Sequence, residues 1–309
     1  MSNPSVSVVI ATYNKADTLP AAIQSVLDQT YRDLEVLVVD DGSTDNTSER
    51  VKPFGDKIRY FRKKNGGTGS TRNLGIAEAK GRFVAFLDGD DLWLPNKLEI
   101  QMKAFEREPQ ISAVQCGAYY VDPSLRVIGR LLCTPKRDTL LDFLLFRNMP
   151  AFASCVVIRK EVLDRIGGFG LDLVILSDWD MVCRLAKNGT LRSVKEPLTL
   201  YRQYPNNQSR SVKIHLWSGA RSLKRFFSDP SLSPEIRRRQ KEIWARFYAM
   251  LAGGYVRNGD WRKGLDWSCR ALRTSPAVAP YIAGMPVRRI LKGLSFSRSR
   301  SFVHMEPRG

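Results

Sequence analysis

Residues 83–95 read FVAFLDGDDLWLP, and this stretch indicates what kind of fold the chain adopts. Five consecutive apolar residues, Phe83–Leu87, predict a buried strand. Three carboxylates follow at Asp88, Asp90 and Asp91. Crowded carboxylates repel one another and lose hydration, so they need a cation or an amide-rich turn beside them. A turn that uses Asp for local amide bonds is one interpretation. Three acids beside a buried strand favour the other, a Mg²⁺ or Mn²⁺ site.

Strands and helices alternate on both sides of this stretch. Val6–Ile10, LEVLVVDDGS (34–43) and KIRYF (57–61) predict further strands. Helices are predicted for TLPAAIQSVLDQ (18–29, capped by Thr18), STRNLGIAEAKG (70–81, closed by Gly81) and PNKLEIQMKAFERE (95–108, with Pro95 in the first turn). The alternation predicts an α/β fold with a parallel, doubly wound sheet. Ligands of such sheets bind beyond the carboxyl ends of the strands, where ATYN, DDGSTD and DGDD fall.

A mixed pattern begins near residue 112. It predicts paired strands in SAVQCGAYYVDPSLRVIG, a helix in TLLDFLLF, a strand in ASCVVIR and a helix in KEVLDRIGGF. SDWDMVCRLAKNG (177–189) predicts a helix with Ser177 as N-cap and Asp180 as the capping-box acid. Asp178 lies in its first turn, where the helix dipole stabilises an acid without any function, and for Asp178 alone that interpretation is favoured over catalysis.

Positive charge is concentrated in the last third of the chain. The 309 residues are 43% hydrophobic, which is consistent with one or two domains. Residues 201–309 hold 22 Lys and Arg against 6 Asp and Glu, so they carry nearly all of the net charge of +18. We therefore predict a domain over 1–210 and a basic helical region over 211–309 that includes one αα-hairpin. Both histidines, His215 and His304, fall in the second region, so a catalytic base in the first would be a carboxylate.

Several patterns bear on the cellular location. The sequence shows no signal-peptide pattern and no apolar run of about 18 residues. Five scattered cysteines predict free thiols in a cytoplasmic protein. Apolar residues at helical spacing followed by arginines, over 287–302, predict peripheral contact with an anionic membrane at its inner face. Packing of this segment on the hairpin is the alternative.

Two glycine-containing motifs follow predicted strands. NGGTGSTRNLG has the order G-x-G-x-x-R, and we reject an NAD site because Arg72 replaces the third glycine. Arg72 at a helix start suits a pyrophosphate. In VVDDGSTDNTS, Asp41 could accept the N3–H of a pyrimidine, but for this motif alone an Asp-Gly turn with Ser43 or Thr44 capping a helix is the favoured interpretation.

Taken together, these motifs resemble the family-two glycosyltransferases, which have the GT-A fold and are frequent in synthesis of the bacterial envelope and exopolysaccharides. The matching stretches are VSVVIATYN, VLVVDDGSTD, GTGSTRNLGIAEAKG, FVAFLDGDDLW, ASCVVIRKEVLDRIGGF, SDWDMVCRLAKNG and EPLTLYR, in family order over residues 5–204. The resemblance implies inverting transfer of a sugar from a UDP- or dTDP-linked donor, with Mg²⁺ or Mn²⁺, to a glycan or lipid-linked glycan.

The resemblance also implies roles for individual residues. The donor would contact Ala11, Thr12, Tyr13, Asp40, Asp41, Arg72, Asp88 and Gly89. The metal would contact Asp88, Asp90 and Asp91. Asp178 would be the general base, and the acceptor would lie near Asn148, Ser154 and Trp179. Two positions depart from the family: Ser177 replaces the usual Glu before the base, and Tyr204 replaces a His. The Q-x-x-R-W motif of processive synthases is absent, which favours addition of one sugar.

Two other classes of function remain open from the sequence. The basic helical region is compatible with a nucleic-acid-binding protein, but it lacks a recognisable module with stacking aromatics, and we expect no nucleic acid. The second class is a catalytically inactive scaffold, because fold does not guarantee activity. The presence of Asp88, Asp90 and Asp178 argues against it.

Overall fold

The computed structural model describes residues 3–134, 138–148, 153–204 and 211–284. The chain forms two compact units that divide between Ile236 and Arg237. The domain boundary expected near residue 210 from charge stays a prediction.

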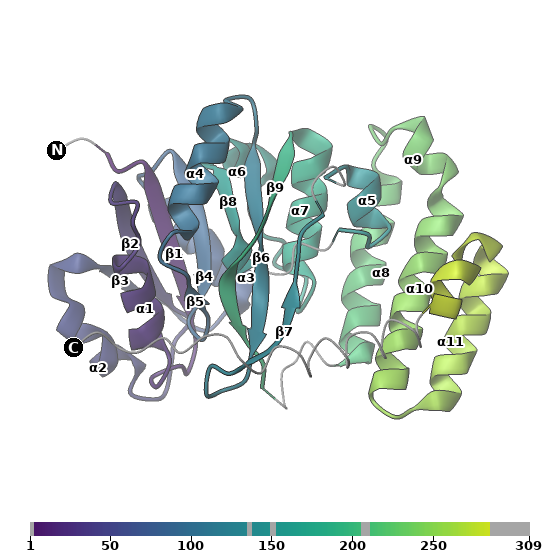
Figure 1. Ribbon diagram of the computed structural model, residues 1–309, viewed down its shortest axis with the longest axis horizontal. Coiled ribbons are helices and arrows are strands. Elements are labelled where there is room, and N and C mark those ends of the chain that lie inside the picture. The colour runs from purple at the N-terminus through teal and green to yellow at the C-terminus, as the bar shows by residue number, and fades with distance from the viewer. Residues whose placement is uncertain (1–2, 135–137, 149–152, 205–210, 285–309) are drawn as a thin grey trace. The chain divides into compact units, whose positions relative to one another are not determined.

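A single mixed sheet forms the centre of the first unit. Its strands are β1 (Val6–Thr12), β2 (Leu34–Asp40), β3 (Arg59–Arg62), β4 (Phe83–Asp88), β5 (Leu92–Trp93), β6 (Ala113–Val121), β7 (Val127–Leu131), β8 (Val156–Arg159) and β9 (Leu191–Arg202). The order is β3-β2-β1-β4-β8-β6-β9-β5, and β7 pairs with β6 (Figure 1). The first four strands of this order are mutually parallel, whereas β8 is antiparallel to both of its neighbours.

Helices lie between these strands and after the last of them. They are α1 (Leu19–Leu27), α2 (Thr47–Val51), α3 (Gly67–Glu78), α4 (Lys97–Arg107), α5 (Leu140–Leu144), α6 (Lys160–Ile166), α7 (Ser177–Asn188) and α8 (Val212–Ser228), with 3₁₀ turns η1 (Lys52–Lys57) and η2 (Ala153–Cys155). The predicted parallel α/β arrangement is thus present in the first half. The predicted strand pair in residues 112–129 is also present, as the antiparallel β6 and β7.

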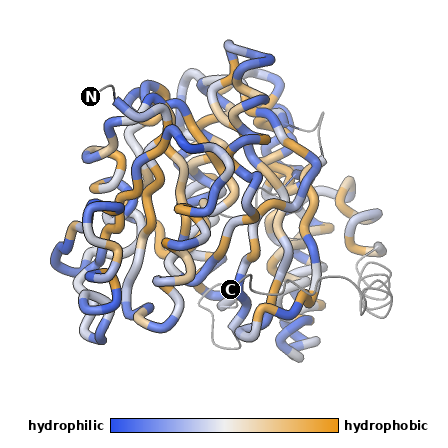
Figure 2. The backbone as a smooth tube through the Cα atoms, turned by 60° about the vertical axis from the view of Figure 1, so that its left-hand side comes forward, coloured by the Kyte–Doolittle hydropathy of each residue, from blue (hydrophilic) through white to orange (hydrophobic). Residues whose placement is uncertain are grey.

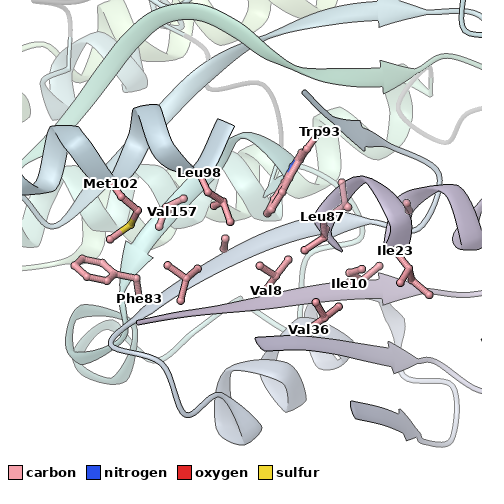
Figure 3. Close-up of a cluster of buried hydrophobic side chains, with 14 of the residues drawn as sticks. Val8, Ile10, Ile23, Val36, Phe83, Leu87, Trp93, Leu98, Met102 and Val157 are labelled. Carbon is pink, nitrogen blue, oxygen red and sulfur yellow. The ribbon is translucent and has the colours of Figure 1, made fainter. Parts of the chain in front are cut away.

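The core forms because the central strands are apolar on both faces. The tube through these strands is largely hydrophobic (Figure 2). Val8, Ile10 and Leu87 pack with residues of α1 and α4, including Ile23 and Leu98 (Figure 3). The opposite face receives α3, whose Gly75 lies so close to β1 that an added Cβ would be 2.2 Å from a methyl group of Val9. A larger residue at Gly75 would therefore separate helix and sheet.

The pairing register brings the polar ends of the strands to one edge of the sheet. Ala11 pairs with Asp88 across β1 and β4, and Thr12 pairs with Asp40 across β1 and β2. The three polar clusters that the sequence places after strands therefore lie together. This agrees with the expected position of a ligand site in a sheet of this type.

Several predicted element ends are wrong. Thr18 is the N-cap residue of α1 as predicted, but its hydroxyl donates to the carbonyl oxygen of Gly89, at 2.8 Å, instead of capping the helix. Helix α3 ends at Glu78, before Gly81, and Pro95 precedes α4 rather than entering its first turn. Residues Ala153–Cys155 form a 3₁₀ turn instead of the start of a strand. In each case a contact distant in sequence or a local turn overrides the pattern used for prediction.

The capping box predicted at α7 is also wrong. Leu176 is the N-cap, and Ser177 is already the first helical residue. The carboxylate of Asp180 is fully buried and binds cations instead of the helix end. It accepts from Arg184 Nε at 2.8 Å, from Ser222 Oγ at 2.6 Å and from an Arg225 guanidinium nitrogen at 2.7 Å. Because two of these donors lie on α8, Asp180 ties α8 to α7.

We expect Asp180→Asn to lower the free energy of unfolding by about 3 kcal/mol, because it leaves two guanidinium groups without their buried counter-charge. Urea unfolding of the full chain measures this. The matched control is Asp172→Asn, which removes ion pairs of partly exposed side chains to Arg221 and Arg225. The control should lose less than about 1 kcal/mol. Equal losses in the two variants would contradict a structural role specific to Asp180.

The second unit contains an αα-hairpin. Helix α9 (Pro234–Arg238) leads into α10 (Gln240–Arg257), which a short turn joins to α11 (Trp261–Thr274), followed by the 3₁₀ turn η4 (Pro276–Val278). Helices α10 and α11 run side by side (Figure 1) and pack through Ala245, Ala249 and Ala271. The predicted hairpin is confirmed. Within the described residues no helix has the length and apolarity needed to cross a membrane. The amphipathic segment predicted at 287–302 lies outside the described residues.

Candidate active site

The acidic turn after β4 is held in place by β1 and α1. Asp88 is the last residue of β4, and Gly89 begins the turn. Gly89 N donates to Ala11 O at 2.9 Å, and a Cβ added to Gly89 would lie 2.9 Å from Thr12 Oγ1. A larger residue at Gly89 would require the Thr12 side chain or the turn to shift. With the bond from Thr18, these contacts position the carboxylates of Asp88 and Asp90.

Arg72 joins two elements that carry predicted site residues. From α3, one of its guanidinium nitrogens donates to Asp88 Oδ1 at 2.7 Å and the other donates to Asp178 Oδ1 at 2.6 Å. The arginine is buried, whereas both carboxylates keep about a quarter of their side-chain surface exposed. Burial disfavours the charged guanidinium, but Asp178 and Asp88 outweigh this and raise the pKa of Arg72. The predicted base and the predicted donor-binding acid therefore share one buried cation.

Asp178 is further oriented by the backbone around it. Its Oδ2 accepts from Ala153 N at 3.0 Å. Leu176, two residues earlier, has a left-handed conformation with φ of 60°. Such a conformation costs a non-glycine residue about 1 kcal/mol or more and is common at functional sites. Both features fix the start of α7, so the carboxylate has a defined position with one side open to solvent.

Asp90 is paired with a residue that sequence reasoning missed. Lys15 Nζ donates to Asp90 Oδ2 at 2.5 Å and lies 5.0 Å from the ring centroid of Tyr204. Burial lowers the pKa of Lys15, but Asp90 outweighs it and the net pKa is raised. The only sequence signal was that Lys15 directly follows ATYN, at the same sheet edge. Tyr204, at the position where the family often has His, thus contributes an aromatic face.

Asp91 points into the protein. It is 1% exposed, its Oδ2 accepts from Ser154 Oγ at 2.7 Å, and its Oδ1 accepts from Arg202 N at 3.0 Å. Burial, together with Asp90 and Asp88, raises its pKa well above the usual range. Both oxygens are used by protein donors. We therefore do not retain Asp91 among the proposed metal ligands.

Asp88 and Asp90 fit a divalent cation better. Among the described residues, no three His, Cys, Asp or Glu side chains form a ready metal cage. A Mg²⁺ ion, however, is often held by one or two carboxylates and substrate phosphates. Within that same part of the chain, Asp88 Oδ2 and Asp90 Oδ1 accept no hydrogen bond. Two partly exposed carboxylates, each with an available oxygen, suit this mode of binding.

The residues predicted around the nucleoside differ in accessibility. Tyr13 is 45% exposed, while Ala11 and Thr12 are buried. Thr12 Oγ1 has no hydrogen-bond partner among the described residues. Asp41 Oδ1 accepts from Lys63 Nζ and from Gly66 N, and its Oδ2 accepts from Gly67 N at 2.8 Å. Asp41 therefore holds the loop that begins α3, the helix that carries Arg72.

Asp40 and the predicted acceptor residues are buried. Asp40 accepts from Ser43 and from Tyr60 Oη at 2.6 Å, so it stabilises the turn after β2. The predicted acceptor residues are Asn148, Ser154 and Trp179. Asn148 Nδ2 donates to Asp138 Oδ1, and Trp179 Nε1 donates to the carbonyl oxygen of Phe143. Their contact with an acceptor stays a prediction, and their burial favours a structural role.

The decisive comparison is with models of protein families. The model described as "Glycosyl transferase family 2" matches residues 7–167, more than half of the chain. The chain belongs to glycosyltransferase family 2. The predicted GT-A fold and the predicted class of enzyme are thereby confirmed at the level of the family.

Curated relatives of this family-2 chain include proteins of Rickettsia and of Escherichia coli. A glycosyltransferase of Rickettsia felis is 31% identical over 227 residues, which cover 70% of this chain and 38% of that protein. A glucosyltransferase of Escherichia coli, WfgD, is 38% identical over 61% of this chain and 72% of its own. Its name gives UDP-Glc as donor and α-D-GlcNAc-diphosphoundecaprenol as acceptor. The chain spans about a third to three fifths of the length of the rickettsial relatives.

Solved structures share the fold of this family-2 chain. TarS 1–349 of S. aureus in complex with UDP-GlcNAc has a TM-score of 0.62 at 18% identity, covering 96% of this chain and 91% of that one. The mannosyltransferase PcManGT of Pyrobaculum calidifontis, in complex with GDP-Man and Mn²⁺, has a TM-score of 0.59 at 17% identity, covering 97% and 89%. At these identities the likeness concerns the fold.

Proposed function

We propose that the protein transfers one sugar, with inversion, from a UDP- or dTDP-linked donor to a hydroxyl of a glycan or lipid-linked glycan. The observation that carries this proposal is the bridge that Arg72 forms between Asp88 and Asp178. It brings a partly exposed carboxylate on α7 close to the carboxyl end of β4. A base for the acceptor and a site for the donor diphosphate are thus neighbours.

The proposed chemistry assigns a separate task to each side chain. Asp178 accepts the proton of the acceptor hydroxyl as that oxygen attacks C1 of the donor sugar. The new C1–O bond forms on the face opposite the breaking bond to the diphosphate, through an oxocarbenium-like state, so the configuration inverts. The bonding electrons leave with the nucleoside diphosphate. Arg72 is placed to balance part of its charge.

A divalent cation belongs to the proposal. Asp88 and Asp90 would hold Mg²⁺ or Mn²⁺, which when bound supplies a Lewis acid for the leaving diphosphate. The Mn²⁺ complex of PcManGT supports this for the fold. Lys15 lies against Asp90 and adds a second positive charge at the same place.

The donor class is supported by relatives. WfgD is named for UDP-Glc, and TarS has been solved with UDP and with UDP-GlcNAc. The acceptor proposed here, a lipid-linked glycan, follows the name of WfgD. The proposed location is the cytoplasm, with peripheral attachment to the membrane that carries such an acceptor.

Donor binding can be tested by thermal shift with UDP-Glc, UDP-GlcNAc, dTDP-rhamnose and GDP-Man, each with Mn²⁺. A ligand at 100 times its Kd stabilises the folded state by about 2.7 kcal/mol, so the correct donor should raise Tm by several degrees. We expect a UDP- or dTDP-sugar to do so, and the same sugar to be transferred to a diphospholipid-linked glycan. Stabilisation by GDP-Man alone, or by none of the four, would contradict the proposed donor class.

A further inference from the structure

An open, positively charged groove lies at one end of the helical hairpin in the second unit. Its volume is about 590 Å³. It is lined by residues from α9, from the start of α10 and from the end of α11, and none of them is acidic. The residues that matter here are Arg237, Arg238, Lys241, Trp244, Tyr248 and Arg270. The proposed transfer reaction uses none of them.

The positively charged residues around this groove outnumber the acidic residues of the second unit that could neutralise them. Residues 237–284 contain ten Lys and Arg but only three Asp and Glu. Two of the three acids, Glu242 and Asp260, pair with Arg239 and Lys263, which do not line the groove. In the described part of the chain, Arg238 and Lys241 form no ion pair, and both are exposed. Exposed cations gathered without carboxylates repel one another, and an anion would relieve this.

Two aromatic residues, Trp244 and Tyr248, line the groove, and Trp267 packs behind Tyr248. Trp244 and Tyr248 have ring centroids 5.7 Å apart, and Tyr248 and Trp267 have centroids 5.4 Å apart. The guanidinium carbon of Arg270 lies 5.1 Å from the ring centroids of Tyr248 and Trp267. This stacking holds Arg270 in place and leaves the edge of its guanidinium able to donate. The groove therefore offers an oriented cation beside half-buried rings.

We propose that this groove binds a phosphate ester, with the phosphate against Arg238, Lys241 and Arg270 and the attached group along Trp244 and Tyr248. Guanidinium forks match the oxygens of phosphate in pairs, and several cations at one place suit a multiply charged group better than a single carboxylate. The volume is in the range of ligand sites that hold more than an isolated phosphate ion. The inference does not depend on the transfer reaction proposed above.

The test uses the full chain, with ¹⁵N-labelled tryptophan side chains observed by NMR and the Trp244 resonance assigned through Trp244→Phe. Pyrophosphate, added in the presence of EDTA, should shift the Trp244 indole signal in a saturable manner. Arg238→Gln with Lys241→Gln should weaken this binding about tenfold or more, because two charged donors are lost. The matched control, Arg257→Gln with Arg262→Gln, removes two exposed cations near the turn between α10 and α11, away from the groove, and should change affinity less than about twofold.

A second arm separates two sources of phosphate. Vesicles of phosphatidylglycerol are compared with vesicles of phosphatidylcholine in co-sedimentation. Binding to phosphatidylglycerol that pyrophosphate competes away, and that the Arg238/Lys241 variant loses, would identify a lipid headgroup. Binding of pyrophosphate without vesicle binding would identify a free phosphate ester.

Three results would overturn the inference. The first is no shift of the Trp244 signal at millimolar pyrophosphate together with no vesicle binding. The second is an equal loss of binding in the control variant, which would indicate general electrostatic attraction. The third is displacement of pyrophosphate by a short single-stranded RNA at much lower concentration, which would assign the groove to nucleic acid. Melting temperatures of both variants verify that the exposed substitutions leave the fold intact.

Discussion

Replacing Asp178 with Asn should lower the rate of sugar transfer by about 10²–10⁴-fold. The amide of Asn cannot accept the proton of the acceptor hydroxyl. The side-chain oxygen of Asn can still accept one of the two hydrogen bonds that Arg72 and Ala153 N donate to Asp178. Affinity for the nucleotide should change little, because the base faces the acceptor. Transfer rate, donor affinity and Tm are to be measured on the same preparation.

The alternative is that Asp178 only stabilises the start of α7. Asp178→Asn would then cost about 0.3–1 kcal/mol from the helix dipole, with some addition from the weakened contact to buried Arg72, and transfer would be nearly normal. The matched control is Ser177→Ala at the neighbouring position of the same turn. We expect it to leave the rate within a few-fold of the parent. If the two variants have similar rates, Asp178 is not the base.

Removal of the divalent cation should abolish turnover, and Asp90→Asn should reduce it by about a thousandfold, several kcal/mol of transition-state stabilisation. The reason is that Asp90 carries one of the two carboxylates open to a cation at the end of β4. Transfer is measured after dialysis against EDTA and again after addition of Mn²⁺ or Mg²⁺. Full activity in excess chelator would exclude the proposed metal.

Lys15→Met is the informative companion to Asp90→Asn. It removes the ammonium that pairs with Asp90 but leaves both carboxylates. If the metal neutralises the charge of the diphosphate, this variant should remain dependent on Mn²⁺ and recover activity as the Mn²⁺ concentration is raised. If Lys15 itself supplies the needed charge, activity should fall and no amount of metal should restore it. Either variant should keep the Tm of the parent within a few degrees, because the pair is partly exposed.

Local sequence patterns were sufficient to predict the helices and strands. They were not sufficient to predict which distant side chains contact each other. The apolar run Phe83–Leu87 and the alternation around it predict β4 and its neighbours because burial dictates the composition of a central strand. The same reasoning could not predict Lys15 beside Asp90, since 75 residues separate them. Nor could it show that Asp91, adjacent to Asp90, faces the interior. Which carboxylate of a tight turn faces solvent depends on donors from distant segments, here Ser154 and Arg202.

Asp180 shows the same limit at α7. Its position three residues after Ser177 fits a capping box, but the buried carboxylate pairs with Arg225 of α8. A capping bond competes with an ion pair for the same oxygens, and the ion pair prevails because the guanidinium would otherwise lack a buried partner. Spacing within one helix contains no information about a helix that packs on it.

The shared arginine has a consequence for how the site responds to change. Arg72 divides its two donor edges between Asp88 and Asp178, which lie 90 positions apart in the sequence but contact the same guanidinium. Removing one carboxylate frees Arg72 to move toward the other. The effects of Asp88→Asn and Asp178→Asn should therefore not be additive, with an interaction energy of about 0.5–3 kcal/mol in a thermodynamic cycle of the two single variants and the double variant. Substitutions at positions 88 and 178 should therefore arise together in evolution rather than independently.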